Sequence, residues 1–144
     1  MSVTAAPPGT LRPRSERIRG PLLTAATIGA ATLALHVRDP HVTHSWGVCP
    51  LYALTGIYCP GCGGLRGVND LTDGHLGQAA SSNLLLVLAI PVALVAFGRW
   101  SYGAWTGREI PPIPALPQAV KVGLIALAVA FTVVRNLPGS WLAP

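Results

Sequence analysis

Three long apolar stretches dominate the pattern of hydrophobic and polar positions, over about residues 21–37, 84–100 and 119–137. At a rise of 1.5 Å per residue, each stretch is about long enough to cross a hydrocarbon core of roughly 30 Å as an α-helix. Lys121 and Arg135 lie near the ends of the third stretch, where long side chains can reach the membrane surface. The pattern predicts an all-α integral membrane protein with three transmembrane helices.

The segments between these stretches divide the rest of the chain. Residues 1–20 are rich in Arg and Pro and are expected to form a flexible basic tail, so that 21–144 is a single membrane domain. Residues 38–75 are expected to form a loop that contains a short interfacial helix. Four closely spaced prolines in 106–118 exclude a helix there and predict a stiff connector.

A signal peptide is the alternative interpretation of the first apolar stretch, because an Arg-rich segment precedes it. We favour a retained span, since the basic tail is long and no clear Ala-x-Ala cleavage site follows.

The composition agrees with a membrane protein. Hydrophobic residues make up 51% of the chain and charged residues 10%, whereas soluble domains carry about 25% charge. The same figures exclude a disordered chain. The net charge of +5 comes largely from the tail and not from a basic face, so we expect the lipid bilayer, a membrane-protein partner or a second copy as partners, and no nucleic acid.

The distribution of basic residues predicts the orientation, because cytoplasmic segments of membrane proteins are enriched in Lys and Arg. An N-terminus in the cytoplasm places more basic residues inside than outside. It also places the loop 38–75 outside the cell membrane. The inner basic residues are then Arg12, Arg14, Arg17, Arg19, Arg99, Arg108 and Lys121, and the outer ones are Arg38, Arg66 and Arg135.

All three cysteines and all four histidines fall within residues 36–75. Pro60 and Gly61 form a tight turn that can bring the sulfurs of Cys59 and Cys62 to one side. Such a turn can present two thiolates to zinc, and a structural zinc site needs four ligands. The third ligand would be Cys49. The fourth would come from His41, His44 or His75, and His44 is our candidate.

Two other chemistries use the same residues. In thiol redox chemistry, the dipole of a helix that begins after Cys59 would acidify this thiol, and Arg66 would add to the effect. Cys49 would then be the resolving partner, with a quinone as the electron acceptor. In a purely structural role, a disulfide from Cys49 to Cys59 or Cys62 would brace the loop. All three alternatives require Cys49 to lie close to the other two cysteines.

Polar residues after the cysteines recur at helical spacing and so share one face of a predicted helix. Arg66 and Asp70 are placed for an i,i+4 ion pair. We interpret both as structural residues on an interfacial face rather than as a catalytic site.

Several short motifs carry a resemblance to a known family. They are Cys49-Pro50, Thr55-Gly56, Cys59-Pro60-Gly61-Cys62-Gly63, Arg66, Gly74, Ala79-Ala80 and Asn83. In these motifs the chain resembles a family of small bacterial membrane proteins known as domain of unknown function 2752. The resemblance implies a bacterial envelope protein without an assigned reaction, and a structural role for Asn83. The chain departs from the family at Leu65, where Thr is common, and at Leu84, where Pro is common, so we expect a less sharply bent second span.

The sequence therefore predicts a small multi-pass envelope protein with a non-catalytic accessory or scaffold role and a loop tied by a disulfide or a metal. The competing class is a membrane thiol–disulfide oxidoreductase, whose catalytic residues would be Cys59, Cys62 and Cys49.

Overall fold

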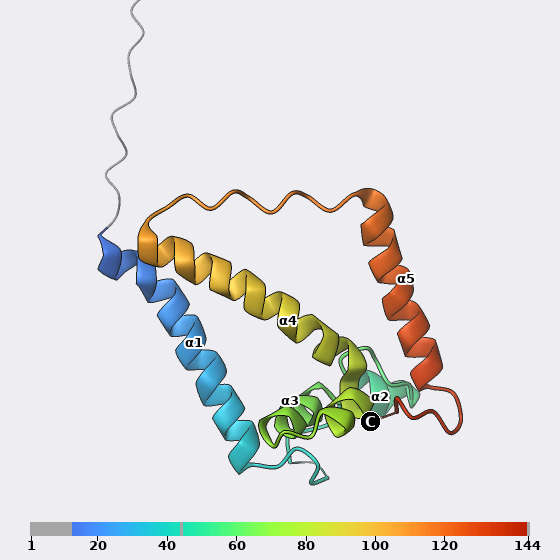
Figure 1. Cartoon of the computed structure of the whole chain (residues 1–144). Helices are drawn as coiled ribbons and strands as arrows, with labels where there is room; N and C mark the ends of the chain where they lie inside the picture. Colours follow the sequence, from blue (N-terminus) through green and yellow to red (C-terminus); the bar gives the residue numbers. More distant parts are fainter. Residues whose placement is uncertain (1–12, 44, 144) are drawn as a thin grey trace, which may run out of the picture.

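The computed structural model describes residues 13–43 and 45–143, and within them the chain is helical without any strand (Figure 1). Two short helices lie between the first and second of the three long ones, where the sequence predicts one. The helices are α1 (Arg14–Val37), α2 (Pro50–Thr55), α3 (Gly64–Thr72), α4 (Leu76–Thr106) and α5 (Gln118–Arg135).

The three long helices α1, α4 and α5 are each long and apolar enough to cross a membrane. In each, only 11% of the apolar window is buried inside the chain, so most of its side chains need lipid or another protein around them. The end of α1, the start of α4 and the end of α5 gather at one end of the molecule, together with α2 and α3 (Figure 1). The predicted all-α, three-span architecture is confirmed.

Helix α1 begins at Arg14, within the segment 1–20 that we expected to be a flexible tail. Residues 1–12 of that segment lie outside the described residues. Pro13 precedes the helix, and Glu16 in its first turn is favoured by the helix dipole. The guanidinium of Arg14 stacks on the ring of Trp105 in α4, at 3.6 Å from the ring centroid. This contact holds the start of α1 against the end of α4.

Helix α4 contains a break at Asn83, whose backbone is extended (φ −160°, ψ 92°). The break separates residues 76–82 from a long straight helix over 84–106, and the second part begins where the sequence predicts the second span. Residues 107–117, with their prolines, run extended from α4 to α5 at the opposite end of the molecule from the cysteines (Figure 1).

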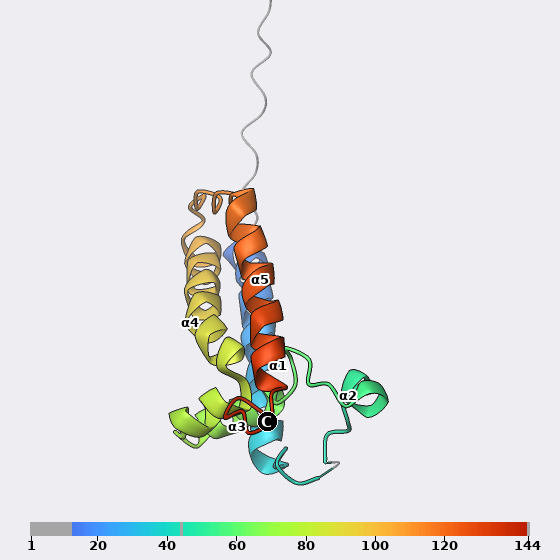
Figure 2. The same cartoon turned by 90° about the vertical axis from the view of Figure 1, so that its right-hand side faces the viewer.

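The helices that pack against one another are α1, α3 and α4. Ala79 and Leu35 are buried where they meet. Helix α5 stands apart from them along most of its length and approaches them only at its last turn (Figures 1 and 2). The packed part of the molecule is therefore the end that holds the loop.

Candidate cysteine site

The three cysteines converge on one point, although they come from two segments of the loop. Cys49 precedes α2, and Cys59 and Cys62 lie in the turn before α3. The Sγ atoms of Cys49 and Cys59 are 3.8 Å apart, those of Cys59 and Cys62 are 3.3 Å apart, and all three lie within 4.8 Å of one another. We call this group the three-cysteine cluster. The expected proximity of Cys49 to the other two is confirmed.

The turn from Cys59 to Gly64 is shaped by its own backbone. The N–H of Cys62 donates to the carbonyl of Cys59 over 3.1 Å, and the N–H of Gly64 donates to that of Gly61 over 3.1 Å. Gly63 has φ +75°, in the left-handed region that other residues rarely adopt, and α3 begins immediately after it. The turn therefore places both sulfurs on one side and leads directly into a helix.

The two thiols at the edges of the cluster differ in acidity. The backbone N–H of Tyr52, at the start of α2, lowers the pKa of the Cys49 thiol. Burial raises the pKa of Cys62 to about 12. In the absence of a metal, Cys49 is thus the more readily ionised of the two, and Cys62 keeps its proton.

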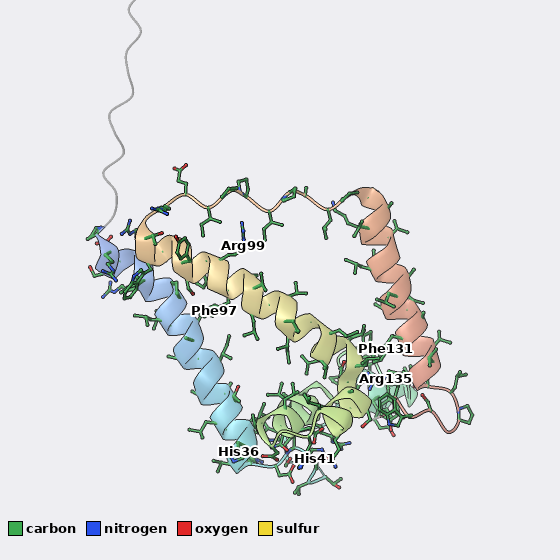
Figure 3. All side chains as sticks on the ribbon, in the orientation of Figure 1. His36, His41, Phe97, Arg99, Phe131 and Arg135 are labelled. Carbon is green, nitrogen blue, oxygen red and sulfur yellow. The ribbon has the colours of Figure 1, made fainter. Side chains whose placement is uncertain are left out.

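Arg135, on the last turn of α5, reaches the cysteine turn (Figure 3). Its guanidinium donates to the carbonyl of Cys59 over 3.0 Å, to that of Cys62 over 3.1 Å, and to that of Ser82 over 3.3 Å. The residue is only 1% exposed. We expected this side chain to reach the membrane surface. In the structure it is buried instead, because three carbonyls accept hydrogen bonds from its guanidinium in place of water.

The neighbouring Asn136 holds the segment just before Cys59. Its Oδ1 accepts a hydrogen bond from the backbone N–H of Tyr58 over 2.8 Å, and its Nδ2 donates to the carbonyl of Tyr58 over 3.0 Å. Both backbone groups of one loop residue are thus satisfied by one side chain, that of the residue that caps the end of α5. The sequence carries no distinctive signal for these contacts, because Arg135 and Asn136 have the pattern of an ordinary helix end.

Asn83 holds the same turn from the side of α4. Its Nδ2 donates to the carbonyls of Pro60 (2.8 Å) and Cys62 (3.1 Å), and its Oδ1 accepts from the N–H of Leu86 (3.0 Å). The side chain therefore caps the straight part of α4 and supports the cysteine turn at once, which explains the break in the helix.

The predicted ion pair between Arg66 and Asp70 does not occur among the ion pairs of the described residues. The Nε of Arg66 donates instead to the carbonyl of Pro40 over 3.3 Å. Asp70 is buried, accepts a hydrogen bond from the hydroxyl of Ser82 over 2.9 Å, and pairs with the Nε2 of His41 over 3.2 Å. The face of α3 that carries Asp70 is turned to α4 and the loop, where these partners lie.

The described histidines do not complete the three-cysteine cluster. Within residues 13–43 and 45–143, the cluster contains only cysteines. His41 lies between Asp39 and Asp70, and His36 pairs with Asp73 over 3.2 Å (Figure 3). His44, our candidate for the fourth ligand, lies outside the described residues.

A cleft of about 620 Å³ opens beside the cluster. Cys49 and Cys62 line it, together with Arg66 and the aromatic residues Tyr52 and Tyr58. The two tyrosine rings stack with their centroids 4.4 Å apart. The cluster is therefore reachable from the surface of the loop.

One protein-family model matches the part of the chain that holds this site. The model of the family described as "Protein of unknown function (DUF2752)" matches residues 49–97, which include the three cysteines and the break at Asn83. The break is present although Leu84 follows it in place of the family's usual Pro, because the Asn83 side chain holds it. No curated protein and no solved structure matches the chain. The resemblance seen in the sequence is confirmed over residues 49–97, which hold the three-cysteine cluster, α2, α3 and most of α4.

Proposed function

We propose that this chain is a non-catalytic accessory or scaffold protein of the bacterial cell membrane, in which the three-cysteine cluster binds a zinc ion and so ties the loop. The observation that carries the proposal is the convergence of all three sulfurs within 4.8 Å. A disulfide would use two of them and leave the third without a partner. A metal uses all three.

The spacing of the sulfurs supports zinc. Two thiolates bound tetrahedrally at about 2.3 Å from zinc lie roughly 3.8 Å from each other. The separations of 3.3 and 3.8 Å in the cluster are close to this value, whereas a disulfide requires about 2.05 Å. Bound zinc would supply folding energy by cross-linking the start of α2 to the turn before α3.

His44 is the proposed fourth ligand. Its neighbours Thr43 and Ser45 line the same cleft as Cys49 and Cys62. An imidazole from this part of the loop would complete a Cys₃His set, which is a common structural zinc site.

The surroundings of the cluster favour a structural role over catalysis. The carbonyls of Cys59, Pro60 and Cys62 are bound by side chains of α4 and α5. The polar groups nearest to the site therefore hold its shape.

Metal content tests this proposal. The full chain, purified in detergent without chelator, is expected to contain about one zinc per chain by mass spectrometry of the metal. Cys49→Ser, Cys59→Ser and Cys62→Ser should each lower this content, and so should His44→Ala. His36→Ala is the matched control, because His36 pairs with Asp73 away from the cluster. A metal-free protein whose mass is lower by two hydrogens would show a disulfide and contradict zinc binding.

A membrane thiol–disulfide oxidoreductase is the second candidate, favoured by the opening of Cys49 and Cys62 on the cleft. The Cys49 thiolate, 3.8 Å from Cys59, would attack a Cys59–Cys62 disulfide, form a Cys49–Cys59 disulfide and release the Cys62 thiolate. Net oxidation of a dithiol would pass two electrons and two protons to a quinone. An enzyme of this kind would accumulate normally as a Cys→Ser variant and lose only its redox activity, whereas a structural cluster would lose accumulation.

We also propose that the cluster faces the outside of the cell. Arg14, Arg99, Arg108 and Lys121 belong to the opposite end of the molecule, where the connector lies, and this bias supports a cytoplasmic location for that end. After reduction and metal removal, a membrane-impermeant thiol reagent should label the cysteines of intact cells. Labelling only of inverted vesicles would reverse the orientation.

A further inference from the structure

We propose that Arg135 is a positioning residue that supplies the counter-charge of the metal-loaded three-cysteine cluster. The inference rests on the proposed zinc site and extends it to a residue of the third span. Arg135 lies outside residues 49–97, the segment that matches the family model.

The first observation is a buried positive charge without an acidic partner. Arg135 is 1% exposed, and no ion pair of the described residues includes it. Its Nε is buried without a hydrogen-bond partner. The groups that accept its other hydrogens are neutral carbonyls. A buried guanidinium without a counter-charge is costly, so a negative charge nearby would stabilise the arrangement.

The second observation is the identity of those carbonyls. Two of the three belong to Cys59 and Cys62, so the guanidinium lies against the backbone of two proposed ligands. Three thiolates around a Zn²⁺ ion carry a net charge of −1. Together with Arg135 the site becomes neutral, whereas three protonated thiols would leave the arginine charge uncompensated. Arg135 therefore favours the deprotonated ligands that metal binding requires.

The third observation concerns the approach of α5. This helix packs little against the others, and Arg135 and Asn136 are its hydrogen-bonded links to the loop (Figures 1 and 3). The ring of Phe131, one turn earlier, covers the guanidinium at 4.8 Å from its central carbon. The last turn of α5 thus shields the charge from solvent and directs it at the cysteine turn.

The test is a Co²⁺ titration of the reduced, metal-free full chain in detergent, followed by the sulfur-to-cobalt charge-transfer absorption. Arg135→Gln removes the charge and should weaken Co²⁺ binding about ten- to hundredfold, the usual effect of losing a group that supports metal ligands. Arg135→Lys keeps the charge and should restore binding to within about tenfold of the wild type. Lys121→Gln, at the exposed start of the same helix, is the matched control and should bind like the wild type.

The outcomes separate the two proposals. A wild-type chain without cobalt–thiolate absorption would overturn the zinc site and this inference together. A wild-type chain that binds Co²⁺ no more tightly than Arg135→Gln would overturn only the role of Arg135. Arg135→Lys and Arg135→Gln could also weaken Co²⁺ binding equally and lower the melting temperature of the metal-free protein equally. This result would show that Arg135 acts through its hydrogen bonds and would contradict its role as a counter-charge.

Discussion

At the cysteine end of the molecule, polar and charged side chains are buried, whereas along the three spans the apolar side chains are exposed. Leu94 in α4 and Ile125 in α5, for example, are 63% and 65% exposed. The buried polar or charged residues of the described chain are Asn69, Asp70, Ser82, Asn83 and Arg135. Each makes a hydrogen bond to another segment.

The difference shows where specific structure resides. A span only has to be long and apolar, because lipid covers its surface and its backbone is satisfied within the helix. The cysteine end has no such freedom, since each buried polar group requires a particular partner. Substitutions should therefore cost much more at the cysteine end than in the spans.

Asn83→Ala should give the largest effect. It removes three hydrogen bonds and leaves the carbonyl of Pro60 and the N–H of Leu86 without their partner, while the carbonyl of Cys62 keeps its bond from Arg135. The expected cost is about 3–5 kcal/mol in the free energy of unfolding. Denaturant unfolding in detergent micelles measures this change. Gln118→Ala, an exposed amide at the start of α5, is the control and should change the value by less than about 0.5 kcal/mol. Similar costs for both would remove the distinction between the two regions.

Asn136→Ala should have a smaller effect, because it releases only one loop residue from α5. Loss of the two hydrogen bonds to Tyr58 should cost about 1–3 kcal/mol. Amide hydrogen exchange at Tyr58 should accelerate, while exchange in the middle of α4 stays unchanged. Asn136→Asp keeps the acceptor and loses the donor. The exchange rate at Tyr58 in this variant should therefore lie between those of the wild type and Asn136→Ala. Unchanged exchange at Tyr58 would show that α5 does not hold the loop.

Asp39→Asn should give the smallest effect, since this carboxylate is exposed. The backbone N–H of His41, at 2.7 Å, lowers the pKa of Asp39 below its ordinary value of 3.8. A lowered pKa in the folded state stabilises the protein above pH 3.8, and this contribution is lost as the pH falls through the folded-state pKa. The stability difference between the wild type and Asp39→Asn should therefore shrink as the pH is lowered from 5 to about 3. A constant difference over this range would contradict the assignment.

The sequence predicts the spans well because they are local properties of the chain. The start of the straight part of α4 at Leu84 agrees with the point where the apolar run begins, directly after Asn83. The approach of Cys59 to Cys62 is also predictable, since Pro60 favours a turn and the glycines around Cys62 can adopt the backbone conformations that a tight turn requires.

Other contacts could not be predicted, because they join residues that are distant in the sequence. The i,i+4 spacing favours Arg66 as the partner of Asp70, but His41 occupies that place from the preceding loop. Arg135 is 76 residues from Cys59, and the pattern around it is that of an ordinary helix end. Helical spacing indicates which residues share a face and not which segment packs against that face.

The position of Arg135 on the last helix has a consequence for biosynthesis. Helices α1, α3 and α4 contact one another and precede α5 in the order of translation, so they can assemble while α5 is still on the ribosome. The guanidinium that binds the cysteine turn arrives only when the third span has been inserted. Chains whose third span fails to insert would carry all three cysteines in an incomplete setting, exposed to oxidation and to quality-control proteases.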